Sequence, residues 1–262
     1  MKVGYVQTSP IFSEVTQNFE QVEKLLGYSK ADLIVLPELF ATGYTFISKE
    51  EAELLAENIE GKTAEFLMGI ARRTNAVVVG GFIEKDGNQI FNSSMIVSDS
   101  EVLGTYRKLH LYYKEKLWFS PGNKPLEMYE VKDIKVGIMI CFDWFFPETI
   151  RSLTLLGADI IAHPANLVLP YCQRAMITRC LVNRVFAITS NRIGNETRGD
   201  DSFTFTGGSQ ITSFNGDVIS SAPKDKSYID FVEIDVTQAR DKNLNKYNNV
   251  IKDRRTELYS LE

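Results

Sequence analysis

Three side chains that could take part in covalent chemistry lie at the ends of predicted strands in this sequence of 262 residues. They are Glu38 in VLPELF, Lys108 in YRKLHL and Cys141 in ICFDWFFPE. Strand ends of open α/β sheets hold side chains rigidly beside the crevice in which substrates bind. Taken singly, such a carboxylate or lysine is usually solvated, and such a cysteine is usually a small core residue. Only the combination predicts a site.

A thiol, a carboxylate and an ammonium are the groups that an acyl-transfer site needs. A free thiol is only weakly ionised at neutral pH, so attack by Cys141 requires a base. Glu38 is the best candidate for that base. Lys108 and a backbone N–H beside the nucleophile would form an oxyanion hole, in which each donor is worth roughly 2.7 to 4 kcal/mol.

The elements that must position these residues alternate between strand and helix in the first half of the chain. Apolar residues recur at helical spacing in some segments, and continuous or alternating apolar runs mark the strands. An Asp-Gly turn at positions 86 and 87 starts an antiparallel meander. Strands are predicted over residues 2–7, 31–37, 76–84, 90–98 and 102–108, and helices over 15–29, 49–59 and 63–74.

The second half repeats the alternation and then ends in strands. Pro147 is suited to open a helix and Gly157 to close it. Strands are predicted over 135–141, 159–163, 185–190, 208–213, 218–221 and 229–235, and helices over 147–156 and 173–183. Strands that are apolar on both faces indicate a mixed sheet covered by helices, so the fold class is α/β. The charged tail from Val236 onward is expected to pack along a partner or the surface rather than in this chain's core.

Composition excludes several classes of protein. The chain is 44% apolar with a net charge of −5 and has no basic block, which disfavours nucleic acid as a partner. No apolar run is long enough to span a membrane. Three cysteines without a CxxC pair indicate reduced thiols, and with no signal-peptide pattern we expect a cytoplasmic protein. Two histidines are too few for a zinc site of His and Cys ligands, and no nucleotide-binding glycine motif is present.

Three ordered segments together resemble the nitrilase superfamily of carbon–nitrogen hydrolases. They are ELFATGY (38–44), YRKLHLYYKEKLWFSPG (106–122) and VGIMICFDWFFPE (136–148). Further matches are HPAN, SNRIG, GGSQI and DRRTELY, so the resemblance covers essentially the whole chain. It implies one domain over residues 1–262, folded as a four-layer α-β-β-α sandwich. It also implies a homodimer, and from its charged sequence we expect the tail at 236–262 to pack at a subunit interface.

The resemblance also assigns roles to individual residues. Matching the motifs position by position makes Cys141 the nucleophile, Glu38 the general base and Lys108 the oxyanion-stabilising lysine. Glu115 matches a second glutamate that positions the substrate and supports the lysine. The chemistry needs no metal and no organic cofactor.

Five further residues lie in segments that match pocket-lining stretches of the family. They are Tyr44, Phe142, Trp144, Phe145 and Asn166, with Phe142 also supplying a backbone N–H. For the aromatic residues, packing in the core or at a dimer interface is an equally good interpretation. Two cysteines, Cys172 and Cys180, and two histidines, His110 and His163, are expected to be structural, and Asp200 and Asp201 to form a solvated loop.

Hydrolysis of a small amide to an acid and ammonia, through a cysteine thioester, is the predicted function. Cys141-Phe142-Asp143 resembles the amidase and carbamoylase branches more than the branch in which Trp-Glu follows the nucleophile. An archaeal group that shares CFDWFFPE and HPANLV is assigned nitrilase activity on small dinitriles, so nitrile hydrolysis stays open. An N-carbamoyl amidohydrolase would need a cation such as Arg174 in its pocket. A non-catalytic binding protein on the same fold is the alternative of a different class.

Overall fold

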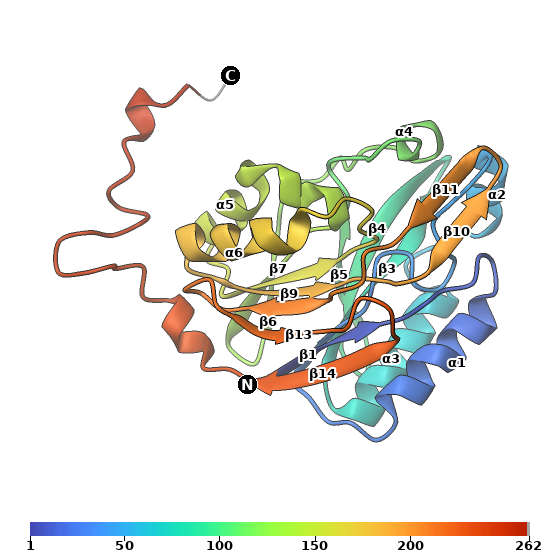
Figure 1. The fold of residues 1–262 in the computed structure, drawn as a ribbon, viewed down its shortest axis with the longest axis horizontal. Helices are drawn as coiled ribbons and strands as arrows, with labels where there is room; N and C mark the ends of the chain where they lie inside the picture. The colour runs from blue at the N-terminus through green and yellow to red at the C-terminus, as the bar shows by residue number, and fades with distance from the viewer. Residues whose placement is uncertain (261–262) are drawn as a thin grey trace.

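A computed structural model describes residues 1–260 as two six-stranded sheets packed face to face between helices (Figure 1). The first sheet contains parallel strands β1, β2 and β3, and the other strands in it pair antiparallel. In spatial order its strands are β14 (Tyr228–Glu233), β1 (Lys2–Gln7), β2 (Leu33–Val35), β3 (Val77–Asp86), β4 (Gln89–Val97) and β5 (Val102–Arg107).

The second sheet has a similar plan, with parallel strands β7, β8 and β9 at its centre. Its outer strands also pair antiparallel. In spatial order its strands are β13 (Val218–Ser221), β12 (Gln210–Thr212), β9 (Phe186–Ser190), β8 (Ile160–Pro164), β7 (Ile134–Ile138) and β6 (Met128–Val131).

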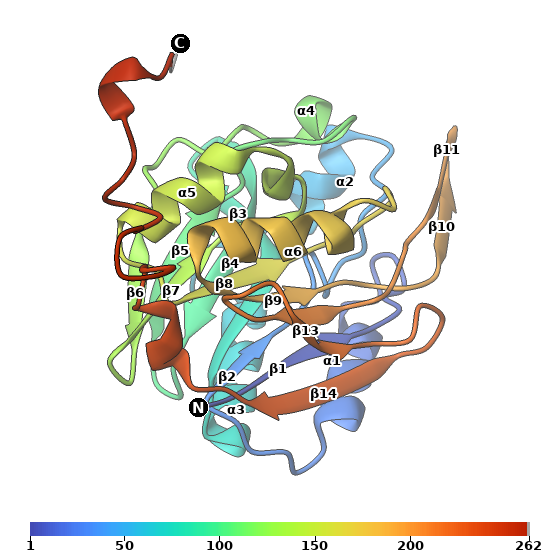
Figure 2. The ribbon, with the colours of Figure 1, turned by 60° about the vertical axis from the view of Figure 1, so that its left-hand side comes forward.

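Helices cover the outer face of each sheet. Helices α1 (Val15–Leu26) and α3 (Lys62–Thr74) lie on the first sheet, and α5 (Pro147–Leu155) and α6 (Cys172–Asn183) lie on the second (Figures 1 and 2). The result is the four-layer α-β-β-α sandwich that the family resemblance implied. Short helices α2 (Lys49–Leu54) and α4 (Glu115–Trp118) lie near the rim where the meander strands end. Within the described residues, 3₁₀ helices span Cys141–Phe145, Val236–Ala239 and Thr256–Leu258.

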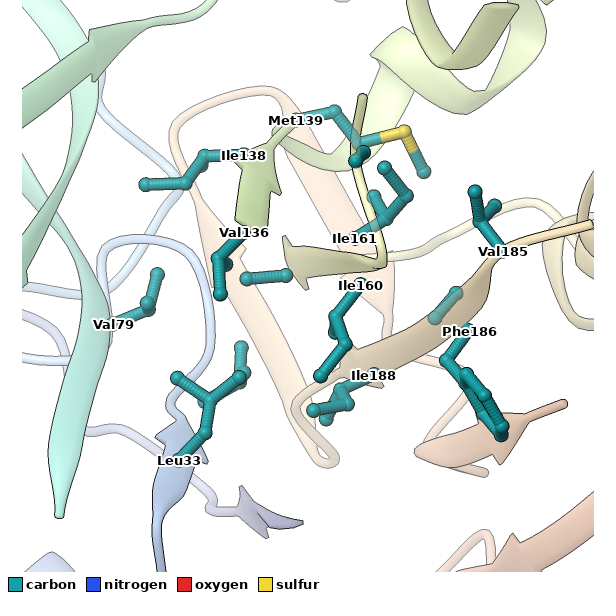
Figure 3. Packing of buried hydrophobic residues seen from close by; sticks show 14 of the residues in the cluster. Leu33, Val79, Val136, Ile138, Met139, Ile160, Ile161, Val185, Phe186 and Ile188 are labelled. Carbon is teal, nitrogen blue, oxygen red and sulfur yellow. The ribbon is translucent and has the colours of Figure 1, made fainter. Parts of the chain in front are cut away.

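Apolar side chains between the two sheets form the central core. Figure 3 shows Leu33 and Val79 of the first sheet facing Val136, Ile160 and Ile188 of the second. All five are fully buried. At about 25 cal/mol per Å² of apolar surface, this layer stabilises the packing of one sheet on the other. A second cluster, between the first sheet and helices α1 and α3, closes the other side.

Most of the predicted elements are present, and the local signals explain their ends. Helix α1 buries Val22 and Leu26 and stops at Gly27, whose φ of 51° is costly for other residues. Helix α5 begins at Pro147, and Gly157 follows it with a φ of 100°.

Some predictions need correction, and some elements were not predicted. Helix α2 ends at Leu54 rather than near position 59. Strand β6 and the hairpin of β10 (Asn195–Arg198) with β11 (Asp201–Thr204) were not predicted, because β6 is only four residues long and the two hairpin strands carry mostly polar residues. The view that the tail from Val236 avoids the core is wrong for its first turn, since Val236 is 3% and Ala239 0% exposed. Lys242 still donates to the carbonyl oxygens of Asn183 and Arg184, and beyond it the chain runs away from the body, where Tyr247 is 80% exposed (Figures 1 and 2).

Among residues 1–260, no helix combines the length and the apolar character needed to cross a membrane.

Candidate active site

Four polar side chains converge because they follow strands of both sheets. Glu38 comes after β2 and Lys108 after β5, which run in the same direction in the first sheet. Cys141 comes after β7 and Asn166 after β8, which are parallel in the second sheet. Since the carboxyl ends of parallel strands meet at one edge, the packed sheets bring the two pairs together. Segments far apart in sequence thus share one buried site.

An ion cluster of one lysine and two glutamates lies at the centre of the site. Lys108 Nζ donates to Glu38 Oε1 at 2.6 Å and to Glu115 Oε1 at 2.8 Å. All three side chains are buried. Asn92 Nδ2 also donates to Glu38 Oε1, at 2.7 Å, and the backbone N–H of Tyr112 donates to Glu115 Oε2 at 3.0 Å. The cluster therefore fixes both carboxylates in position.

The electrostatic balance of the cluster favours a charged lysine. Burial by itself would lower the pKa of Lys108, but the carboxylates of Glu115 and Glu38 outweigh it and raise this pKa above its ordinary value. Burial raises the pKa of Glu115, and Lys108 opposes that shift. Lys108 is thus suited to stabilise an anion without giving up its proton.

Cys141 lies in a tight turn at the end of β7. Its φ is 40°, in the left-handed region that residues other than glycine rarely adopt, and the 3₁₀ helix starts there. Burial, followed by the negative charge of Glu38, raises the pKa of the thiol well above its ordinary value. Cys141 is therefore a neutral thiol at pH 7 and needs a base. Glu38 Oε2, the second oxygen of that carboxylate, has no hydrogen-bond partner among residues 1–260.

A small cavity borders the thiol. Its lining side chains are uncharged or, for Cys141, neutral at pH 7. Asn166 is buried, and neither atom of its side-chain amide has a partner among the described residues. The lining is formed by Tyr112, Cys141, Phe142, Trp144, Asn166, Leu167, Val168 and Leu169.

A second small cavity lies on the Glu115 side and includes Tyr44. Burial and the nearby Glu115 raise the pKa of Tyr44 well above its usual value, so its hydroxyl keeps its proton. Glu196 accepts from the backbone N–H groups of Tyr44 and Thr45, at 3.0 and 2.7 Å. Arg192 Nη1 donates to Glu196 at 3.0 Å. A buried ion pair therefore holds the loop that carries Tyr44.

The structure separates the five residues expected to line the pocket. Phe142, Trp144 and Asn166 line the cavity beside Cys141, and Tyr44 lines the cavity beside Glu115. Phe145 lines neither cavity and is 51% exposed, because it lies on the outer side of the 3₁₀ turn.

Sequence reasoning did not single out Asn92 or Tyr112. Asn92 is a buried amide within the apolar strand β4, and such a residue needs a specific partner. That signal was available. Tyr112 carried no signal beyond its place between Lys108 and Glu115.

The residues expected to be structural are mostly confirmed. Cys172 and Cys180 are fully buried on α6. His163 lies 3.0 Å from the carbonyl oxygen of Cys141, and His110 Nδ1 lies 2.7 Å from Asp143 Oδ1. The solvated-loop prediction is wrong for Asp201, which is buried and accepts from Lys114 Nζ at 2.7 Å. Within residues 1–260, no three His, Cys, Asp or Glu side chains are grouped to hold a metal ion.

Known proteins resemble this chain along its length. It is 46% identical over 263 residues to a protein named nitrilase from Pyrococcus abyssi, covering 99% of each chain. It is 31% identical to an (R)-stereoselective amidase from a Pseudomonas species, covering 92% of this chain and 87% of the relative. A solved carbon–nitrogen hydrolase from Helicobacter pylori G27 superposes with a TM-score of 0.86 at 24% identity, covering 99% of this chain and 97% of that one. The model of the carbon-nitrogen hydrolase family matches residues 2–242, and the chain belongs to this family.

Proposed function

We propose that this enzyme hydrolyses a carbon–nitrogen bond in a small uncharged amide, with Cys141 as the nucleophile. The observation that carries the proposal is the arrangement of Glu38. One of its oxygens is held by Lys108 and Asn92, and the other has no partner among the described residues. A carboxylate held on one side and free on the other is suited to accept a proton from a neighbouring neutral thiol.

The first half of the reaction forms a thioester. Glu38 takes the thiol proton while Cys141 Sγ bonds to the amide carbon. Lys108 and the backbone N–H of Phe142 receive the oxygen on which negative charge develops. The carbon–nitrogen bond then breaks, and Glu38 returns the proton to the departing nitrogen, so ammonia leaves.

The second half consumes one water molecule. Glu38 removes a proton from the water as its oxygen attacks the thioester carbon. The carbon–sulfur bond breaks, the thiol of Cys141 regains the proton, and a carboxylic acid is released. Amide and water thus become acid and ammonia. Glu115 keeps Lys108 in place and charged throughout.

The cavity beside Cys141 supports a neutral substrate. Its lining offers no cation to a carboxylate, and the unpartnered amide of Asn166 offers a donor nitrogen and an acceptor oxygen. Arg174, the residue that could have bound the carboxylate of an N-carbamoyl amino acid, is exposed on α6 and does not line this cavity. We propose that Asn166 binds a polar group of the substrate. Phe142 and Trp144 contribute apolar walls.

A nitrile is the second candidate substrate, and the 46% identity to a nitrilase favours it. Addition of Cys141 Sγ to the nitrile carbon, with a proton passing to nitrogen, gives a thioimidate. One water molecule converts the thioimidate to the same thioester with loss of ammonia. A second water molecule releases the acid, so the same residues serve both reactions.

We also propose a homodimer in a reducing, cytoplasmic compartment. Apolar side chains on the adjacent helices α5 and α6 face solvent, which is costly for a free monomer surface. They are Leu155, Leu156, Ile177, Leu181 and Val182. The extended tail beyond position 240 could bury Leu244 and Tyr247 on a second copy. All three cysteines are free thiols, as expected in a reducing compartment.

Ammonia release from a panel of small compounds tests the function. The panel holds aliphatic amides, mononitriles, dinitriles and N-carbamoyl amino acids. We expect turnover of amides and loss of more than about a thousandfold in the Cys141→Ala variant, since the nucleophile is removed. Cys180→Ala is the matched control, because it removes a buried thiol of α6 outside the site and should keep full activity.

Other outcomes of the panel have distinct meanings. Turnover of nitriles with amides inert would replace the amide by the nitrile as substrate. Activity that survives in Cys141→Ala would refute the proposed nucleophile. An intact protein that is silent on every compound, with Cys141 no more reactive toward iodoacetamide than Cys172 or Cys180, would favour a non-catalytic binding protein. If Asn166 binds the substrate, Asn166→Leu should raise KM for substrates with a second polar group more than for apolar ones.

A further inference from the structure

Asp143 is a buried carboxylate two residues after Cys141 that lines neither cavity of the site. Its side chain accepts four hydrogen bonds. The backbone N–H of Ile140 donates to Oδ2 at 2.9 Å, and the hydroxyl of Tyr106 donates to the same oxygen at 2.7 Å. The backbone N–H of His110 donates to Oδ1 at 3.1 Å, and His110 Nδ1 lies 2.7 Å from Oδ1.

These donors come from two different parts of the site. Ile140 directly precedes the nucleophile at the end of the second sheet. Tyr106 and His110 lie two residues before and two residues after Lys108, at the end of the first sheet. One carboxylate therefore ties the turn that carries the thiol to the segment that carries the cation.

The turn at Cys141 needs such support. Its positive φ of 40° is unfavourable for a residue with a side chain, and it persists only if surrounding contacts hold it. The Asp143 side chain accepts from the backbone N–H of Ile140, the residue before Cys141, and His163 Nε2 lies 3.0 Å from the carbonyl oxygen of Cys141. Both ends of the strained residue are fixed.

The two side chains that donate to Asp143 are themselves held in place. Tyr106 is buried, and burial together with Asp143 raises its pKa well above the ordinary value, so it remains a donor. The ring of His110 stacks on Phe146 at 3.6 Å between centroids, which fixes the nitrogen that faces Oδ1. The side chain of Asp143 is fully enclosed.

We infer that Asp143 is a positioning residue that sets the placement of Cys141 Sγ relative to Lys108 and Glu38 without touching the substrate. This inference rests on the proposed role of Cys141. Its physical basis is that misplacement of reacting groups by about 1 Å can lower a rate about a hundredfold.

The test compares Asp143→Asn with the parent enzyme. An amide cannot accept from both donor pairs, because one of its two polar atoms carries hydrogens. We expect kcat to fall about 10- to 100-fold while KM changes less than about threefold. The rate at which iodoacetamide alkylates Cys141 should fall in parallel. Cys172 and Cys180 are fully buried, so they should not contribute to the alkylation that is measured.

Tyr106→Phe and Tyr129→Phe form a matched pair. Each removes one tyrosine hydroxyl that donates a hydrogen bond, from Tyr106 to Asp143 and from Tyr129 to the carbonyl of Thr105 at 2.9 Å. Only the first bond reaches the Cys141 turn. We expect Tyr106→Phe to slow both turnover and alkylation about three- to tenfold, and Tyr129→Phe to leave both within twofold.

If Asp143→Asn does not fold, the tyrosine pair decides the inference. Alkylation and kcat within twofold of the parent in a folded Asp143→Asn, or equal effects of the two tyrosine variants, would overturn it. Because alkylation needs no substrate, this result is separate from the panel. A failed panel with slowed alkylation refutes the proposed substrate, and a successful panel with unchanged alkylation refutes the role of Asp143.

Discussion

Glu38 presents its two carboxylate oxygens to different surroundings. Oε1 accepts from Lys108 and from Asn92, whereas Oε2 has no partner among the described residues. A buried oxygen without a hydrogen bond costs free energy, roughly 1 to 3 kcal/mol. Such a cost at the centre of a site is expected where the atom has a task in the reaction. In the proposed mechanism that task is to carry the proton between thiol, ammonia and water.

His163 supplies a prediction at the scale of one residue. Burial lowers its pKa to about 4, and its Nε2 faces the carbonyl of Cys141, so the neutral ring donates there. Between pH 6.5 and 4 the unfolded chain binds a proton that the folded chain does not, so stability falls as pH falls through this window. A shift from 6.5 to about 4 corresponds to about 3 kcal/mol.

His163→Gln should remove this dependence. The free energy of unfolding, measured in urea at pH 7 and at pH 4.5, should fall by about 2 to 3 kcal/mol less in the variant than in the parent. Equal pH dependence in the two proteins would mean that His163 is protonated in the folded state.

At the scale of elements, strand β3 supports the segment that carries Glu38. Gly81 in β3 lies directly against that segment. A Cβ added to Gly81 would lie 2.5 Å from the backbone nitrogen of Leu39 and 2.7 Å from Cα of Glu38. Both neighbours are backbone atoms, so the Glu38 segment or the strand would have to move. The glycine is therefore required by close approach of two chains, since its φ is not positive.

Gly81→Ala should damage the site as well as the fold. We expect a loss of about 1 to 3 kcal/mol in stability from overpacking, and a fall in kcat of about tenfold or more in the protein that remains folded. Gly69→Ala in α3 is the control, because its nearest neighbour would be an arginine nitrogen 4.0 Å away. That change should stabilise the helix by about 0.5 to 1 kcal/mol and leave kcat unchanged. Normal kcat in Gly81→Ala would show that the Glu38 segment adapts.

The sequence predicts some elements better than others, for physical reasons. Helices α1 and α5 can be predicted because their apolar stripes, the proline that starts α5 and the glycines that follow both helices are local signals. The β10–β11 hairpin does not, because its residues are polar and its position depends on distant contacts. Asp201 of that hairpin accepts from Tyr113 and Lys114, which lie more than 80 positions earlier.

The candidate site divides in the same way. Glu38, Lys108 and Cys141 were found from their places after strands and from motif resemblance. Their mutual geometry was not available, since no local signal says how two sheets pack. Phe145 illustrates the limit, because neighbouring positions in one short turn face opposite environments: Trp144 is buried and Phe145 is exposed.

At the scale of the whole molecule, the outer surface of α5 and α6 is the best candidate for contact between two copies. Leu181, at 44% exposure, lies on this surface. Leu181→Glu should place a charge at the proposed interface and shift sedimentation from dimer toward monomer. Leu54→Glu on α2, where the leucine is 84% exposed, is the control and should leave the dimer intact. A parent protein that sediments as a monomer at all concentrations would contradict the proposed dimer.

The packing of two sheets against each other carries a further consequence. Glu38 and Lys108 belong to one sheet and Cys141 and Asn166 to the other, so the apolar layer shown in Figure 3 sets how far apart the two halves of the chemistry stand. Substitutions in that layer never meet the substrate, yet each small shift is passed to the thiol. Substitutions that accumulate in this layer would thus lower the catalytic rate before they unfold the protein. Selection for catalysis therefore also acts on the buried apolar residues between the two sheets, although none of them contacts the substrate.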